Sequence, residues 1–179
     1  MKRLFVAIDF PEAIKAQLKP LCTDLQGAKW VAQHQMHLTL RFIGDMDDEQ
    51  LKQIQTGLAT VHATPFQMRL EGIGQFPPKG KPRVIWVGVK AEPSLNQLQQ
   101  KIERVIRESG FEKADHPFSP HITLARCKTP PPIEQVERYF KRHQSFQSDT
   151  FDVSGFVLYS SQLSPSGSIY HQESFYSLV

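Results

Sequence analysis

Apolar residues recur along the chain with two spacings that alternate from segment to segment. Runs of β-branched, aromatic and aliphatic residues predict strands, and apolar residues three or four positions apart predict amphipathic helices. The strands are expected at about residues 3–9, 37–42, 66–70, 84–89, 121–125, 151–159 and 169–175. The helices are expected at about 11–25, 51–61, 95–110 and 133–143. Between them, Gly44-Asp45 is expected to end a strand, and Gly72–Arg83 to form a loop rich in Gly, Pro and Lys.

These elements follow one order twice: strand, helix, strand, helix, strand. Matching elements lie roughly 80–86 residues apart when they are counted along the sequence. The order predicts an α+β fold in a single bilobal domain, with pseudo-repeats at about 1–80 and 81–179. Two antiparallel sheets are expected to face a central cleft, with the helices on the outside.

The third element of each repeat carries the same polar pair. The tetrapeptide His37-Leu38-Thr39-Leu40 returns 84 residues later as His121-Ile122-Thr123-Leu124. Side chains alternate between the two faces of a strand, so the His and Thr of each motif share one face and the aliphatic residues point into the core. If the two strands lie side by side, two imidazoles and two hydroxyls face one small volume.

Paired imidazoles suit acid–base chemistry on a phosphate. Imidazole titrates near neutral pH, so one ring can take a proton from water while the other gives a proton to a leaving oxygen. The hydroxyls of Thr39 and Thr123 can donate hydrogen bonds to phosphate oxygens. No Ser or Cys nucleophile with a nearby base is evident, so water is the expected nucleophile. The alternative is structural, with each Thr holding its His within the sheet for packing alone.

A metal site is a second alternative for the two histidines. Zinc requires three or four protein ligands, and His34 is the only further candidate near the first motif. No acidic or Cys residue recurs with the motifs, so we expect no metal and no other cofactor.

Composition narrows the class of protein without identifying it. The 179 residues carry a net charge of +3, which is compatible with an anionic substrate. No apolar run has the length of a membrane span. The basic start is followed by only five apolar residues before Asp9, and we interpret it as a first strand and not as a signal peptide. Two cysteines, Cys22 and Cys127, form no disulfide framework, so a cytoplasmic location is expected.

The paired motifs resemble the HxTx motifs of the 2H phosphoesterase superfamily. Within it the chain is most similar to the bacterial RNA 2′,3′-cyclic phosphodiesterases, historically called 2′-5′ RNA ligases. The resemblance covers essentially the whole chain. It includes the stretches 3–8 (RLFVAI), 37–44 (HLTLRFIG), 82–88 (PRVIWVG), 117–126 (PFSPHITLAR) and 158–161 (LYSS).

The resemblance implies a metal-independent hydrolase that opens the 2′,3′-cyclic phosphate at an RNA end and leaves a 2′-phosphomonoester. It implies that His37 is the proton donor and His121 the proton acceptor, although the two repeats alone leave open which ring is the acid. Thr39 and Thr123 would bind the phosphate. RNA is the implied partner, no protein partner or membrane is implied, and a duplicated chain is expected to be a monomer.

The resemblance also implies that Arg126 binds the phosphate and that Phe42 stacks on the base. Each residue follows its motif histidine by five positions, so strict alternation would place both on the opposite face. They reach the cleft only if the strand ends or bulges before them. The alternatives are core packing for Phe42 and a surface salt bridge for Arg126.

Two other functions use the same residues differently. A ligase or a 2′-5′ phosphodiesterase would act on another ribose phosphate linkage through the same transition state, and no nucleotide-binding fingerprint or ligase lysine motif for ATP is evident. A non-catalytic, single-stranded RNA-binding module would bind oligonucleotides without turnover. The basic loop at 79–83 either steers RNA phosphates or is merely solvated.

Overall fold

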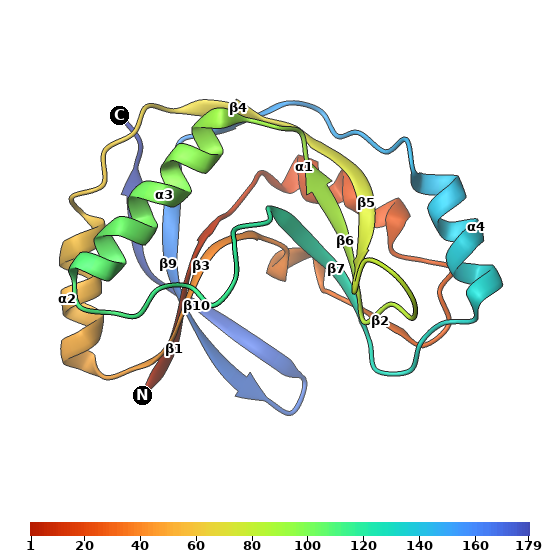
Figure 1. Cartoon of the computed structure of the whole chain (residues 1–179), viewed down its shortest axis with the longest axis horizontal. Coiled ribbons are helices and arrows are strands. Elements are labelled where there is room, and N and C mark those ends of the chain that lie inside the picture. The colour runs from red at the N-terminus through yellow and green to blue at the C-terminus, as the bar shows by residue number, and fades with distance from the viewer.

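The structure is a computed structural model that describes residues 1–179, and eight of its ten strands form two four-stranded sheets (Figure 1). The first sheet has the order β10-β9-β1-β3 and consists of β1 (Lys2–Ile8), β3 (Leu38–Met46), β9 (Gly155–Ser164) and β10 (Gly167–Ser177). The second has the order β2-β7-β6-β5 and consists of β2 (Ala28–Trp30), β5 (Leu70–Phe76), β6 (Val84–Val89) and β7 (His121–Cys127). All pairings within the two sheets are antiparallel.

Helices cover the outer side of each sheet, and a sheet with its helices is called a lobe below. Helices α2 (Asp48–Leu58) and α3 (Pro93–Glu108) belong to the first lobe, and α1 (Glu12–Leu18) and α4 (Ile133–His143) belong to the second (Figure 1). Two short 3-10 turns, η1 (Lys19–Leu21) and η2 (Gln33–Gln35), complete the helical segments. The predicted α+β class, with two antiparallel sheets and outer helices, is confirmed.

Each lobe contains strands from both halves of the chain. Strand β5 follows β4 (Phe66–Met68) in the first half but pairs with β6 of the second half. Strand β9 follows β8 (Phe151–Val153) in the second half but pairs with β1 of the first half. The connections cross where β4 and β8 pair with each other, at the top of Figure 1. Strands β2 and β5 of the first half thus belong to the second lobe, and β9 and β10 of the second half belong to the first.

The core follows from the period of each element. Strand β1 is buried from Leu4 to Ile8, as expected for a central strand with β3 and β9 on its two sides. The apolar stripes of the helices turn inward, for example Leu95, Leu98 and Ile102 of α3. One cluster of 34 buried apolar residues contains side chains from both lobes, so the lobes do not have separate cores.

Local sequence signals account for the ends of several helices. The Asp47 carboxylate accepts a hydrogen bond from the backbone N–H of Gln50, and the side-chain oxygen of Gln50 accepts one from the backbone N–H of Asp47. This capping box begins α2. Pro93 begins α3, where a missing backbone N–H has no consequence. Gly110, with a φ of +92°, ends the same helix as predicted. None of the helices combines the length and apolarity needed to span a bilayer.

Two predicted breaks are wrong because glycines sit in bulges within strands. Strand β3 continues through Gly44 to Met46, with Gly44 at a φ of +107° opposite Leu4. The predicted loop at 72–83 begins only after Phe76, because β5 passes through Gly72, which has a φ of +72°. In both strands the pairing register shifts beside the glycine, as a bulge requires.

Other differences concern segments without a long periodic pattern. The predicted helix at 11–25 ends at Leu18, and Pro20 lies in the 3-10 turn that follows. Strand β2 was not predicted, because Ala28–Trp30 is too short to show an alternation. Residues 151–159 form two strands separated at Ser154, and not one.

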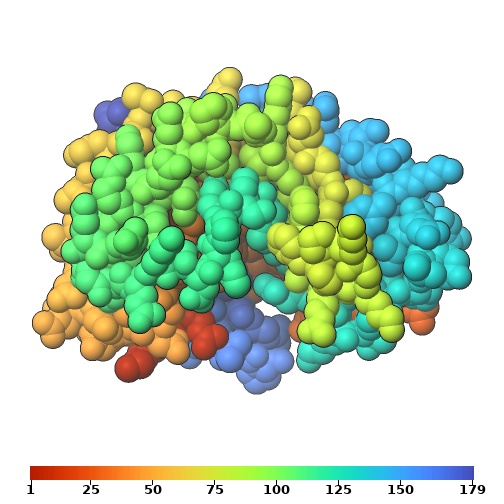
Figure 2. Space-filling model, in the orientation of Figure 1, coloured from red at the N-terminus to blue at the C-terminus, as the bar shows by residue number.

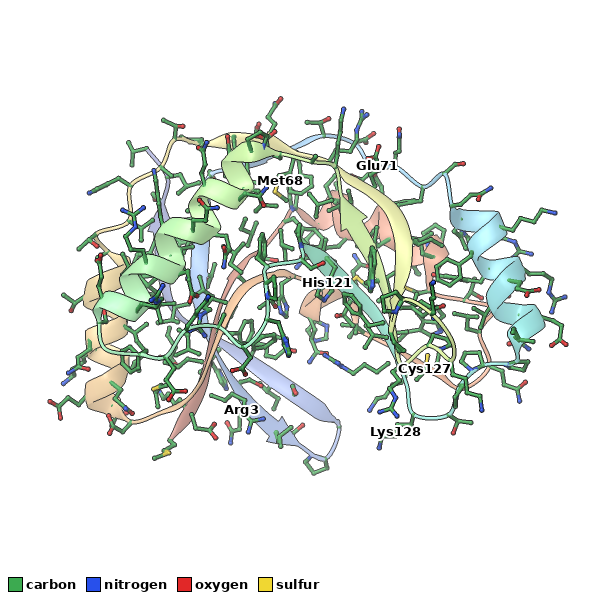
Figure 3. All side chains as sticks on the ribbon, viewed as in Figure 1. Arg3, Met68, Glu71, His121, Cys127 and Lys128 are labelled. Carbon is green, nitrogen blue, oxygen red and sulfur yellow. The ribbon has the colours of Figure 1, made fainter.

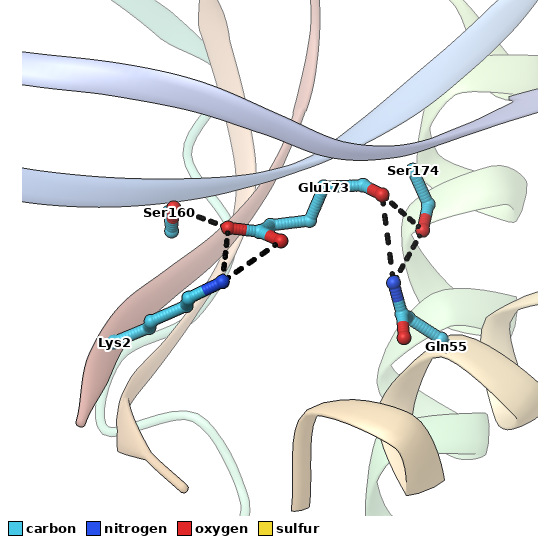
Figure 4. A network of polar contacts seen from close by, with 5 residues as sticks. All are labelled: Lys2, Gln55, Ser160, Glu173 and Ser174. Carbon is cyan, nitrogen blue, oxygen red and sulfur yellow. Dashed lines mark hydrogen bonds and ion pairs between the residues drawn. The ribbon is translucent and has the colours of Figure 1, made fainter. Parts of the chain in front are cut away.

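The outer edge of the first sheet is held by a polar network (Figure 4). The carboxylate of Glu173 on β10 accepts a hydrogen bond from Ser160 of β9 at 2.6 Å and forms an ion pair with Lys2 of β1 at 3.1 Å. The Ser160 hydroxyl is the main cause that lowers the pKa of Glu173. The side chain of Gln55 on α2 donates to the Ser174 hydroxyl at 2.8 Å. The network ties the β9–β10 hairpin to β1 and α2.

Candidate active site

The two motif histidines lie where β3 and β7 begin. Strand β3 of the first sheet contacts β7 of the second, so the motifs meet at the boundary between the lobes. Figure 3 shows His121 there, in the middle of the molecule, and Figure 2 shows that the surface is hollowed between the lobes. The structure thus places both motifs at the central cleft.

His37 and His121 are held by the same local contact. Nδ1 of His37 lies 2.7 Å from the carbonyl oxygen of Gln35, and Nδ1 of His121 lies 2.7 Å from that of Ser119. A carbonyl oxygen only accepts, so each Nδ1 carries the proton. In both rings Nε2 is then left to accept or donate a proton toward a ligand.

Thr39 and Thr123 follow their histidines on the same face of the strands. Both are half-buried, whereas the residues on either side of each, such as Leu38 and Ile122, are fully buried. No hydrogen bond to another protein group is present at either hydroxyl, so both remain available to a ligand. The structural alternative, in which Thr pins His, receives no support, since Gln35 and Ser119 do that instead.

Bulges bring Phe42 and Arg126 to the cleft side. In β3, Thr39 pairs with Ala7 and Arg41 with Val6, which leaves Leu40 as an extra residue. The same shift occurs in β7 at Leu124. The paired partners there are Trp86 with Thr123 and Ile85 with Ala125. The extra residue reverses the alternation in both strands, so the fifth residue after each histidine returns to the histidine's face.

The exposure of these two residues agrees with that placement. The Phe42 side chain is 65% exposed and lies 5.9 Å from the ring of Phe5, so it is not part of the core. Arg126 is exposed and takes part in none of the salt bridges. Core packing of Phe42 and a surface salt bridge of Arg126 are therefore both excluded by the geometry.

Arg41 supports the bulge from behind. Its side chain is 8% exposed, and its guanidinium forms an ion pair with Glu103 of α3 and donates to the carbonyl oxygens of Phe42 and Glu112. A buried charge is tolerated only when it is paired and hydrogen-bonded, which these three contacts provide. This support was not predicted, because the sequence offers no sign that Arg41 points inward.

Aromatic rings surround each imidazole. The ring of Phe5 stacks on His37 at 4.9 Å, and Tyr170 meets the same imidazole edge-on at 5.3 Å. Phe76 and Trp86 lie 4.9 and 6.3 Å from His121. These neighbours were not predicted as site residues, since they come from β1, β5, β6 and β10 and only the tertiary structure brings them together.

Burial is the main cause that lowers the pKa of His37. The carbonyl of Gln35 and the charge of Asp9 act in the opposite direction, and the cations Lys15 and Arg126 lower the pKa further. Asp9 is itself paired with the buried ammonium of Lys15 at 2.8 Å. Arg126 belongs to the other sheet, so its charge acts on His37 from the opposite lobe.

A pocket of about 370 Å³ opens beside His37. Its walls are the η2 turn, the β9–β10 hairpin and the side chains of Asp9, Tyr159 and Tyr170. Burial raises the pKa of Tyr159 to about 12, so its phenol stays protonated and can donate a hydrogen bond. His34 lines the same pocket, but nowhere do three or more His, Cys, Asp or Glu side chains gather in a way that could hold a metal ion.

Two facing antiparallel sheets, each with a His-x-Thr strand at the shared cleft, define a protein of the 2H phosphoesterase class. The sequence model of the 2′-5′ RNA ligase superfamily matches residues 10–164. The chain belongs to this superfamily.

Relatives in other organisms cover nearly the whole chain. The RNA 2′,3′-cyclic phosphodiesterase of Archaeoglobus fulgidus is 36% identical over 171 residues, which span 94% of this chain and 96% of that protein. The protein of the same name from Thermotoga maritima is 34% identical over an alignment of 179 residues, which covers 94% of this chain and 91% of that protein.

Solved structures share the fold. The crystal structure of TT0787 of Thermus thermophilus superimposes with a TM-score of 0.83 at 33% identity, and the match covers 98% of this chain and 97% of that one. The crystal structure of E. coli LigT complexed with 3′-AMP superimposes with a TM-score of 0.80 at 27% identity, covering 99% and 98%.

Proposed function

We propose that this protein hydrolyses the 2′,3′-cyclic phosphate at an RNA end to a 2′-phosphomonoester, by acid–base catalysis with two histidines and without a metal. The observation that carries the proposal is the matching Nδ1 contact of His37 and His121, which leaves both Nε2 atoms to the cleft. Relatives that match nearly the whole chain are RNA 2′,3′-cyclic phosphodiesterases, which supports the choice of substrate.

In the proposed reaction, Nε2 of His121 takes a proton from water as the oxygen attacks phosphorus. The bond between phosphorus and O3′ breaks, and Nε2 of His37 gives its proton to O3′. The phosphate stays on O2′, one water is consumed, and the two imidazoles exchange protonation states before the next turnover. Each ring contributes on the order of 10²–10⁴ in rate.

Three further side chains stabilise the charge that grows on the phosphate. The free hydroxyls of Thr39 and Thr123 donate to its non-bridging oxygens, and the guanidinium of Arg126 adds a positive charge from the second sheet. Phe42, exposed at the cleft, stacks on the terminal base. Asp9 favours the protonated form of His37, which the donor role requires.

The lowered pKa of His37 bears on its role as the acid. The free protein holds His37 mostly neutral at neutral pH, because burial disfavours the imidazolium. A bound phosphate anion at Nε2 opposes that effect and raises the pKa again. His37 therefore takes up its proton together with the substrate, and the donor role is compatible with its burial.

Ligation would use the same groups. A 5′-hydroxyl in place of water would give its proton to His121 and attack phosphorus, the bond to O3′ would break with protonation by His37, and a 2′-5′ linkage would form. A binding module without catalysis gives no reason for two imidazoles with unoccupied Nε2 atoms, and no observation favours it.

We also propose that the protein acts as a cytoplasmic monomer. Both motifs of the site come from one chain, so the proposed chemistry needs no second copy. Cys22 and Cys127 are both free thiols, which supports a reducing compartment.

The proposal is tested by turnover of a 2′,3′-cyclic nucleotide with wild type and with the single variants His37→Ala and His121→Ala. Each variant is expected to lose at least about 10²–10⁴ in kcat/KM, while EDTA leaves the wild type active. Far-UV circular dichroism controls for folding. Wild-type turnover retained by either folded variant would refute the two-histidine mechanism.

A further inference from the structure

Two cations stand opposite one another at the end of β7. Lys29 of β2 is the direct partner of Arg126 of β7 in the antiparallel ladder. Directly opposed residues on neighbouring strands share a face, and like charges in that position destabilise a sheet. Without a neutralising carboxylate, such a pair lowers the stability of the sheet. The pair is therefore expected to have a role other than stabilising the fold.

The face that Lys29 and Arg126 share is the cleft face. Their neighbours along the two strands, Trp30 and Ala125, form the next pair, and Ala125 is fully buried while Trp30 packs against Tyr139 of α4. That pair points to the outer helices. Alternation then turns Lys29 and Arg126 to the side of His121 and Thr123.

No carboxylate neutralises this part of the surface. Neither Lys29 nor Arg126 takes part in a salt bridge, and Lys128, just after β7, has none either. All three side chains are exposed. Figure 3 shows β7 running from His121 between the lobes to Cys127 and Lys128 at the edge of the molecule. The positive charges therefore lie along the path that leads out of the cleft.

Lys29 is joined to the catalytic region by the chain itself. The residue after β2, Val31, donates a backbone hydrogen bond to Leu124 of β7 at 2.8 Å, and the chain then passes through η2 to His37. Strand β2 is thus fixed against β7, the His-x-Thr strand of the second sheet. The chain after β2 leads to β3, the His-x-Thr strand of the first sheet.

From this juxtaposition we propose that Lys29, next to Arg126, forms a second phosphate-binding position, which holds the backbone phosphate on the 5′ side of the terminal nucleotide. The inference rests on the proposed function and deepens it. An RNA strand whose cyclic phosphate lies between His37 and His121 leaves the cleft along β7, over Arg126 and Lys29. The preferred substrate is then an oligonucleotide and not a cyclic mononucleotide.

Three substrates that differ in one phosphate test the proposal. They are adenosine 2′,3′-cyclic phosphate, the same compound with a 5′-phosphate, and the dinucleotide ApA with a 2′,3′-cyclic phosphate end. Wild type is expected to show a kcat/KM about tenfold or more higher on the second and third than on the first, through a lower KM. The variant Lys29→Gln is expected to lose most of that advantage and to leave kcat/KM on the first unchanged.

Salt dependence provides a second readout. Loss of one phosphate contact on a single strand lowers the slope of log kcat/KM against log salt by about 0.7. Lys29→Gln is expected to show this lower slope on the dinucleotide only. The matched control is Lys141→Gln, which removes an exposed lysine from the outer helix α4 and is expected to behave as wild type.

The outcomes separate the two proposals. If wild type turns over all three substrates and Lys29→Gln does not differ from it, or affects all three equally, the second phosphate position is refuted and the proposed function stands. If wild type turns over none, both are refuted. The melting temperature of Lys29→Gln should not fall below that of wild type, because the substitution removes a like-charge pair.

Discussion

The indole of Trp86 lies directly over Gly74, so that a Cβ added to this glycine would come within 2.1 Å of the ring. Gly74 has no left-handed backbone, and the glycine is required only for the close approach of the indole. Trp86 in turn contacts Phe76 and lies 6.3 Å from His121. A residue without a side chain on β5 thus sets the position of the wall behind the second imidazole.

Gly74→Ala is therefore expected to affect both stability and activity. The added methyl group forces Trp86 to move, and overpacking of this kind costs about 1–3 kcal/mol of unfolding free energy. Denaturant unfolding and kcat/KM on a cyclic nucleotide are the measurements. The double variant Gly74→Ala with Trp86→Leu relieves the overlap and should be less destabilised than the sum of the two single variants. Full additivity would contradict this explanation.

Glu103→Gln is expected to destabilise the protein strongly. The carboxylate neutralises the buried Arg41, and removal of one partner of a buried ion pair costs about 3–5 kcal/mol. The control Glu108→Gln removes an exposed carboxylate from the same helix and should change the unfolding free energy by less than about 0.5 kcal/mol. Equal effects of the two substitutions in urea unfolding would show that Arg41 does not depend on Glu103.

The stability of the ligand-free protein should rise with pH as a result of His37. Burial above all lowers its pKa below the usual 6.5, so the unfolded chain binds a proton at a pH where the folded protein does not. Between the lowered pKa of the folded state and the usual pKa of 6.5, the unfolded state binds more protons than the folded state. The unfolding free energy therefore increases with pH until the pH exceeds 6.5. Unfolding of wild type and His37→Gln between about pH 5 and 8 measures the effect. A constant difference between the two proteins would contradict it.

Arg126→Ala is expected to raise the pKa of His37. The guanidinium is one of the cations that lower this pKa, after the larger effect of burial, and its loss makes the imidazolium easier to form. The His37 titration is followed by NMR, together with the dissociation constant of inorganic phosphate, which should increase. An unchanged titration would show that Arg126 does not reach across the cleft in solution.

Phe42→Ala is expected to weaken substrate binding with little effect on folding. Loss of a base–aromatic stacking contact costs about 1–3 kcal/mol, which raises KM by roughly 5- to 150-fold. The side chain is 65% exposed, so the unfolding free energy should change little. Phe42→Tyr keeps the ring and should keep KM. If Phe42→Ala had the same KM as wild type and Phe42→Tyr, stacking of Phe42 on the base would be excluded.

The bulges show where sequence reasoning stops. Alternation places His37 with Thr39 and His121 with Thr123, because two residues of an extended chain span one full period regardless of what surrounds them. The same rule places Phe42 and Arg126 on the opposite face. It fails because β3 and β7 each contain one extra residue that has no partner on the neighbouring strand. Whether a strand bulges depends on its partner, which is distant in sequence.

The sequence by itself determined the elements with a long periodic pattern and the two polar pairs. Helix α4 and strand β6 have the predicted bounds, Ile133–His143 and Val84–Val89, because their periodicity and their flanking prolines are local signals. Only the tertiary structure decided that β2 and β5 join the second sheet and β9 and β10 the first, that Arg41 is buried, and that Lys29 faces Arg126. Those features arise from pairings between segments tens to more than a hundred residues apart, and a local pattern carries no information about its distant partner.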